Sequence, residues 1–128
     1  MNKAEDRLKI PSAEIKIGTK EIEAFQNETL RPIIKKLHSL LLNHFSVLLF
    51  TKKSEYFRIS EDKKGHYIHS IFQTENRYKS ELKGMIIGNF TIQEYKVYSF
   101  NPRMFDKRIY SIVEERILTN QSELDDLR

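Results

Sequence analysis

Cysteine and tryptophan are absent from this chain of 128 residues, and glycine and proline are scarce, with four and three copies. Without cysteine the chain can form no disulfide, cysteine zinc site, iron–sulfur cluster or thiol nucleophile. A disulfide-free chain suits a reducing compartment, so we expect a cytoplasmic protein. We also expect no cofactor and no structural metal.

A long uninterrupted apolar run is also missing. The most apolar stretch extends from Leu37 to Phe50, and polar residues interrupt it. A membrane-spanning helix needs about 20 mostly apolar residues, so we interpret this stretch as a core helix and expect no membrane partner. The first 18 residues are charged and lack the apolar segment of a secretory signal.

Composition and charge predict one folded domain with polar ends. Hydrophobic residues make up 39% of the chain and charged residues 31%, which is ordinary for a globular domain. Residues 1–20 show no lasting apolar period, so we predict a disordered or loosely attached arm there. Residues 21–119 are predicted as a helical domain. Residues 120–128 are predicted as an acidic tail that frays, because residues 111–128 carry five acidic and two basic side chains.

Apolar periodicity predicts a mainly α fold, a compact bundle of about five helices around one long, mostly buried helix over residues 29–50. Thr29 is expected to cap this helix, and Pro32 is tolerated in its first turn. Most of its sides are apolar, so it either lies in the core or faces a second subunit. Its most continuous apolar row comprises Leu30, Ile33, Ile34, Leu37, Leu41, His44, Phe45 and Leu48.

This row predicts Leu41 and Leu48 as two of the positions where truncation would be most destabilising. Leu42 and Phe50 flank the row. If the protein forms a homodimer, these two flanking residues are expected to face the second subunit.

Local signals predict the remaining helix boundaries. Ser60 and Thr74 are candidate N-caps, and Gly88 is a candidate stop in the left-handed conformation. Thr91 and Glu94 have the spacing of a capping box, and Asn101 followed by Pro102 is a strong start signal. The buried faces predicted for these helices are formed by Tyr67, Ile68, Ile71 and Phe72, by Tyr78, Leu82, Met85 and Ile86, and by Phe105, Ile109, Ile112, Val113 and Ile117.

The histidines are the main candidates for chemistry. His66 and His69 are three residues apart on a predicted helix, so they are the pair that could share a metal. They point away from that helix's apolar face, and a solvated polar face is the simpler interpretation. His38 and His44 lie near apolar rows of the long helix. Either is a candidate catalytic base in a buried pocket, although such histidines more often serve as core residues with satisfied hydrogen bonds.

The middle of the chain is mildly basic and rich in aromatic residues. Residues 51–110 carry 12 basic and seven acidic side chains, which suggests weak binding of nucleic acid. The tyrosines and phenylalanines there either fill the core or line a small-molecule pocket. The basic residues of this segment that could contact nucleic acid are Lys63, Lys64, Arg77, Lys79, Lys83, Lys96, Arg103, Lys107 and Arg108.

Two segments carry a family resemblance: residues 25–45 (FQNETLRPIIKKLHSLLLNHF) and residues 85–102 (MIIGNFTIQEYKVYSFNP). They resemble a small family of uncharacterised proteins from Flavobacteria and their relatives, over about residues 21–119. Several members carry the name glyoxalase, so the resemblance implies an enzyme of glyoxalase or lyase type. It supplies no active-site residues.

The residues themselves match none of the known glyoxalase sites. The chain reads as helical rather than as βαβββ units, it lacks a histidine-rich binuclear motif, and it has no cysteine nucleophile. We therefore interpret the chain first as a non-enzymatic helical protein that acts by association with a protein partner or with itself. A glyoxalase-type enzyme and a weak nucleic-acid binder are the alternatives.

Overall fold

The computed structural model describes residues 18–127, and all regular secondary structure within this range is helical, which confirms the predicted mainly α fold. Most of the predicted N-terminal arm lies outside the described residues. The elements are α2 (Thr19–Phe25), the π-helix η1 (Gln26–Leu30), α3 (Arg31–Lys36), α4 (His38–Thr51), the 3₁₀-helix η2 (Glu55–Arg58), α5 (Glu61–Thr74), α6 (Asn76–Ile87), α7 (Ile92–Tyr98), α8 (Pro102–Thr119) and α9 (Gln121–Asp125).

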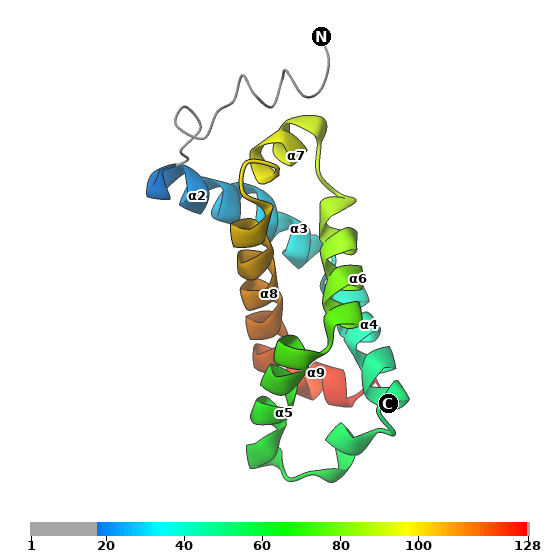
Figure 1. Cartoon of the computed structure of the whole chain (residues 1–128). Coiled ribbons are helices and arrows are strands. Elements are labelled where there is room, and N and C mark those ends of the chain that lie inside the picture. Colours follow the sequence, from blue (N-terminus) through cyan, green and yellow to red (C-terminus); the bar gives the residue numbers. More distant parts are fainter. Residues whose placement is uncertain (1–17, 128) are drawn as a thin grey trace.

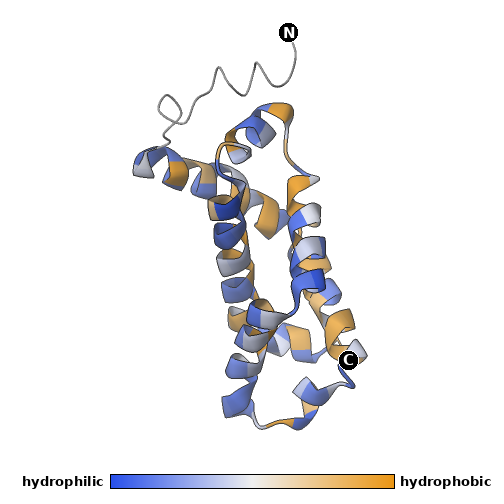
Figure 2. Ribbon diagram, viewed as in Figure 1, coloured by the Kyte–Doolittle hydropathy of each residue, from blue (hydrophilic) through white to orange (hydrophobic). Residues whose placement is uncertain are grey.

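The helices form an elongated bundle (Figure 1). Helices α4, α6 and α8 run along its length, with α2, α3 and α7 at one end and α5, η2 and α9 toward the other. Every α-helix from α2 to α9 contributes at least one buried apolar side chain to a single core. Figure 2 shows that α5, α6 and α8 mix hydrophilic and hydrophobic residues along their length, as expected of helices with one buried face.

The predicted helix over residues 29–50 begins earlier than expected. A helical run starts at Thr19, and Thr29 lies inside it, buried, rather than capping its start. The run widens before Pro32 into a π-turn, in which the Arg31 N–H donates to the Gln26 carbonyl oxygen. A proline ring clashes with the carbonyl four residues before it in a regular α-helix, and a wider turn relieves that clash.

The same predicted helix is broken at Leu37. The segments Thr19–Lys36 and His38–Thr51 meet at an angle of 67°. Leu37 has φ −91° and ψ 11°, and neither proline nor glycine stands at the break. The expectation of one continuous helix over residues 29–50 is therefore wrong at Leu37, although the segment is helical on both sides of the break.

The buried side of helix α4 overlaps the predicted row only in part. Leu41, Leu42, Phe45 and Leu49 are buried, whereas Leu48 is only partly buried. The prediction of a buried Leu41 is confirmed. Leu42, which was expected to face a second subunit if the protein formed a homodimer, is 1% exposed and lies in the core instead.

Two local signals act as predicted. Thr91 Oγ1 accepts from the Glu94 N–H at 3.1 Å, and Glu94 Oε1 accepts from the Thr91 N–H at 2.8 Å, which completes a capping box before α7. Asn101 Oδ1 accepts from the Met104 N–H, with Pro102 as the first residue of α8. All five apolar residues predicted for the buried face of α8 are buried.

At two other predicted boundaries, the helix begins or ends at the expected residue but without the predicted cap or backbone conformation. Ser60 precedes α5 without a side-chain capping hydrogen bond. Gly88 ends α6 in a right-handed conformation, with φ −60°. The left-handed residues among those described are Lys53 and Ser54, which turn the chain from α4 into η2.

The acidic C-terminal segment packs onto the bundle. Leu124 on α9 is fully buried, and Asp125 pairs with Lys64 on α5. The described residues of this segment, up to 127, thus include part of the core.

Among residues 18–127, no single helix is both long enough and apolar enough to span a bilayer; only the bent pair Thr19–Lys36 and His38–Thr51, taken together, meets those criteria of length and composition.

Candidate functional site

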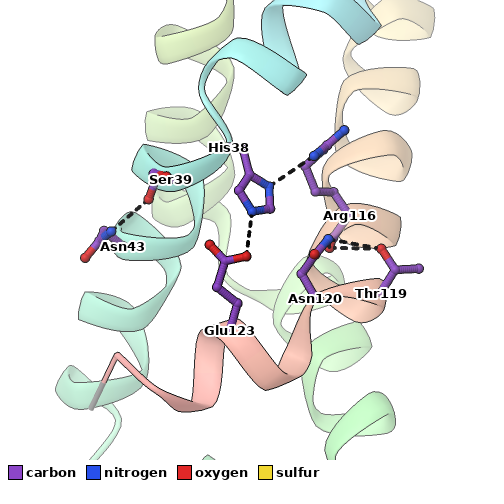
Figure 3. A network of polar contacts seen from close by, with 7 residues as sticks. All are labelled: His38, Ser39, Asn43, Arg116, Thr119, Asn120 and Glu123. Carbon is purple, nitrogen blue, oxygen red and sulfur yellow. Dashed lines mark hydrogen bonds and ion pairs between the residues drawn. The ribbon is translucent and has the colours of Figure 1, made fainter.

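His38 connects three helices near the break at Leu37 (Figure 3). Arg116 Nη1 on α8 donates to His38 Nδ1 at 3.0 Å, and His38 Nε2 lies 3.0 Å from Glu123 Oε1 on α9. A guanidinium group can only donate, so Nδ1 accepts and the ring proton is on Nε2. Both ring nitrogens are thereby engaged. This arrangement holds α4, α8 and α9 together.

His44 lies in a cleft of about 370 Å³ between α4 and α6. Its Nε2 is 2.9 Å from Glu81 Oε1, and its ring stacks on Tyr78 with 5.1 Å between centroids. The hydrogen bond with His44 is the main cause that lowers the pKa of Glu81. His44 Nδ1 has no hydrogen-bond partner among the described residues, but it is shielded from solvent. His44 therefore has one ring nitrogen bound to Glu81 and the other enclosed in the cleft wall.

The structure does not bring His66 and His69 together as a metal site. Both are exposed on α5, and His69 Nδ1 instead lies 2.7 Å from Glu114 Oε2 on α8. Within residues 18–127, no group of three or more histidine, aspartate or glutamate side chains is placed to hold a metal ion.

Lys64 was predicted as part of a basic surface, but it is buried at the junction of α5, η2 and α9. Its Nζ lies 2.9 Å from Glu61 Oε1, 3.4 Å from Asp125 Oδ2 and 4.8 Å from the centre of the Tyr56 ring. The carboxylates outweigh burial, so the pKa of Lys64 is raised. The ammonium therefore stays charged, which suits a structural clamp rather than an amine nucleophile.

The aromatic residues mostly fill the core rather than line a pocket. Phe45, Phe72 and Tyr78 contact one another at ring-centroid distances between 5.4 and 6.1 Å. Phe25, Phe90, Phe105 and Tyr98 form a second group at the other end of the bundle. Aromatic contacts of this geometry stabilise a core.

The basic residues of the middle segment are divided among separate contacts. Lys83 pairs with Asp106, Arg77 with Glu81, and Lys79 lies over the ring of Tyr110. Among the described residues, four further cations make none of these contacts: Lys63 on α5, Lys96 on α7, and Arg103 and Lys107 one turn apart on α8. Apart from Lys107, which lines a groove with Arg31 and Arg108, these cations lie on different helices and do not form the continuous basic track typical of a nucleic-acid site.

Among the described residues, three of the five large exposed hydrophobic side chains lie on α4. Leu40, Val47 and Phe50 are 52%, 62% and 46% exposed. Since α4 carries no charged residue between His38 and Thr51, these side chains form an apolar ridge, which we call the α4 face. The sequence predicted that Phe50 flanks the apolar row of the long helix. It did not predict that Leu40 and Val47 are exposed.

Hollows flank the α4 face on both sides. Val47 and Leu48 line the cleft that also holds His44, with Arg77 and Glu81 at its edge. Phe50 lines a second hollow of about 400 Å³ with Ser54, Phe57 and Arg58. The same surface therefore presents an apolar ridge and recesses beside it.

Comparison of the chain with protein-family models, with curated proteins and with solved structures finds no match.

Proposed function

We propose that this protein acts by association and that it pairs with a second copy of itself through the α4 face. The observation that carries the proposal is the exposure of three large apolar side chains, Leu40, Val47 and Phe50, on the most apolar helix. Leaving such side chains in water forgoes the free energy of burying them, and clustered exposed apolar residues typically mark interaction surfaces.

The spacing of these residues suits packing against another helix. Leu40, Asn43, Val47 and Phe50 follow one another at intervals of three, four and three residues. This is the spacing of a helix–helix seam, in which side chains of one helix enter the gaps of the other. The Asn43 amide donates to the Ser39 carbonyl oxygen at 2.8 Å, so this polar member of the seam already has a partner.

A second copy of the chain is favoured over an unrelated partner because the α4 face carries both a ridge and recesses. A twofold interface brings the same patch of both subunits together, so each ridge must find a recess in that patch. The hollows beside Val47 and Phe50 supply recesses next to the ridge. Arg77 and Glu81 at the edge of one hollow supply the polar rim that is usual around an apolar centre.

Three side chains alone cannot form a stable interface, since such interfaces bury about 800 Å² on each partner. The walls of both hollows must therefore be part of the contact, and we expect a moderate affinity. Sedimentation velocity over a wide range of protein concentrations tests this: the wild-type sedimentation coefficient should rise with concentration toward that of a dimer.

Val47→Lys places a charge in the middle of the α4 face and should hold the protein as a monomer over the same concentrations. Ile92→Lys is the matched control, because Ile92 is 75% exposed on α7, at the other end of the bundle. It should leave association unchanged. A wild-type protein that remains monomeric at the highest concentration would overturn self-association.

A further inference from the structure

We infer that a second surface, the groove along α8, binds a small amphipathic anion: a carboxylate or phosphate group attached to an apolar chain. The groove has a volume of about 820 Å³ and lies between α8, the η1–α3 segment and α5. It is separate from the α4 face and shares no lining residue with the hollows there. The inference does not depend on self-association.

Three cations line the groove, Arg31 from α3 and Lys107 and Arg108 from α8. Among the described residues, none of them forms an ion pair with a carboxylate. Arg108 Nη1 donates to the side-chain oxygen of Gln26, and Arg31 Nε donates to Asn27 Oδ1 at 3.1 Å. Neutral amides orient both guanidinium groups without cancelling their charge. Positive charges gathered in this way repel one another, and an anion would relieve the repulsion.

Apolar side chains line the groove on both sides of Lys107 and Arg108 along α8. Met104, Ile112 and Leu118 line the groove from the same side of α8. The distance along the helix from Lys107 to Leu118 is about 16 Å, at 1.5 Å per residue. Glu114, whose carboxylate is bound by His69, also lines the groove, and so does Glu115, which shares a neighbouring hollow with Arg31. These two carboxylates disfavour a ligand with several negative groups. A ligand with one negative group and an apolar chain therefore matches these residues better than a polyanion does.

The size of the groove is compatible with such a ligand, because small-molecule sites typically measure about 300–1,000 Å³. Decanoate and decyl phosphate are suitable probes, since they share the chain and differ in the anionic group. Acetate and inorganic phosphate supply the charged group alone, and decyltrimethylammonium reverses the charge. Binding is followed by the amide chemical shifts of the ¹⁵N-labelled full-length protein, below the micellar concentration of each probe.

We expect saturable shifts along α8 and η1 with at least one of the two decyl anions, and at least about tenfold weaker binding of the charged groups alone and of the cationic probe. Arg31→Gln combined with Lys107→Gln should weaken binding at least about tenfold, because charge-assisted hydrogen bonds are lost. Lys63→Gln, an exposed lysine at the start of α5 outside the groove, is the matched control and should bind like the wild type.

Ser111→Glu supplies an independent variant that leaves the cations in place. Ser111 is exposed on the groove side of α8, so the substitution should preserve folding while its negative charge repels the ligand. The inference is overturned if neither decyl anion binds, or if binding persists in both groove variants. It is also overturned if a short oligonucleotide competes as well as the decyl anions, which would assign the cations to a polyanion.

Discussion

Tyr78 and Tyr98 are both buried, but their hydroxyl groups have different surroundings. The Tyr98 hydroxyl donates to Asp106 Oδ1 at 2.6 Å, whereas the Tyr78 hydroxyl has no hydrogen-bond partner among the described residues. Burial raises the pKa of both phenols above the ordinary 10.0, and for Tyr98 the hydrogen bond to Asp106 adds to the effect. The two residues therefore form a natural pair for measuring what a buried hydroxyl contributes.

Replacing each tyrosine with phenylalanine should change stability in different ways. Tyr98→Phe removes a hydrogen bond to a carboxylate and should lower the free energy of unfolding by about 1.5–3 kcal/mol. Tyr78→Phe removes a hydroxyl that already lacks a partner, so it should leave stability unchanged or raise it. Urea unfolding of both variants measures this, and a strongly destabilised Tyr78→Phe protein would mean that its hydroxyl has a partner.

Two leucines of α4 test which of its sides lies in the core. Leu41 is 1% exposed, so Leu41→Ala should lower the free energy of unfolding by about 2–5 kcal/mol. Leu48 is only partly buried, so Leu48→Ala should have a clearly smaller effect. Apolar periodicity alone ranked the two positions together. Chemical denaturation measures the free energy of unfolding of both variants. Equal losses would mean that Leu48 is as important to the core as Leu41, as the sequence predicted.

At the scale of elements, α9 is a short helix held by three kinds of contact. Leu124 is fully buried, Asp125 pairs with Lys64, and Glu123 pairs with His38. A chain that ends at Thr119 loses all three and also leaves Lys64 with one carboxylate instead of two. Its melting temperature should fall by about 10 °C or more, since loss of a buried leucine alone removes about 2–5 kcal/mol.

Removal of residues 1–17 is the matched truncation at the other end. This segment has few apolar residues to offset the entropy of ordering, so its deletion should leave the melting temperature nearly unchanged. Calorimetry of both truncated proteins makes the comparison. A large fall on N-terminal deletion would show that Leu8, Ile10, Ile15 or Ile17 contacts the domain.

At the scale of the whole molecule, stability should depend on alkaline pH. Burial is the main cause that raises the pKa of Tyr56, Tyr67, Tyr78, Tyr98 and Tyr110 above the ordinary 10.0. The unfolded chain loses these protons first. The stability that the neutral phenols confer is thus complete below pH 10.0 and is lost as pH rises toward their folded-state pKa values.

Lys52 and Lys64 also contribute stability that is lost at alkaline pH, because carboxylates raise the pKa of both above 10.5. The free energy of unfolding should therefore fall steeply above pH 10, and tyrosinate absorbance should rise together with the loss of helical circular dichroism. Tyrosines that ionise freely near pH 10 while the helices remain intact would contradict this account.

The sequence by itself determined the features that neighbouring residues encode. Thr91 with Glu94 and Asn101 with Pro102 predicted two helix starts correctly, because a cap is formed by residues three positions apart. The buried face of α8 was predicted residue by residue, because its polar side opposes its apolar side. The absence of cysteine excluded disulfides and thiol chemistry without reference to any fold.

Features that depend on contacts between residues far apart in the sequence were decided only by the tertiary structure. Helix α4 is apolar on most sides, so its period cannot select the buried side, and packing left Leu40, Val47 and Phe50 outside. No proline or glycine marks the bend at Leu37, and no local pattern announces the burial of Lys64 or Leu124. Those outcomes depend on contacts between residues tens of positions apart, which a short sequence window does not contain.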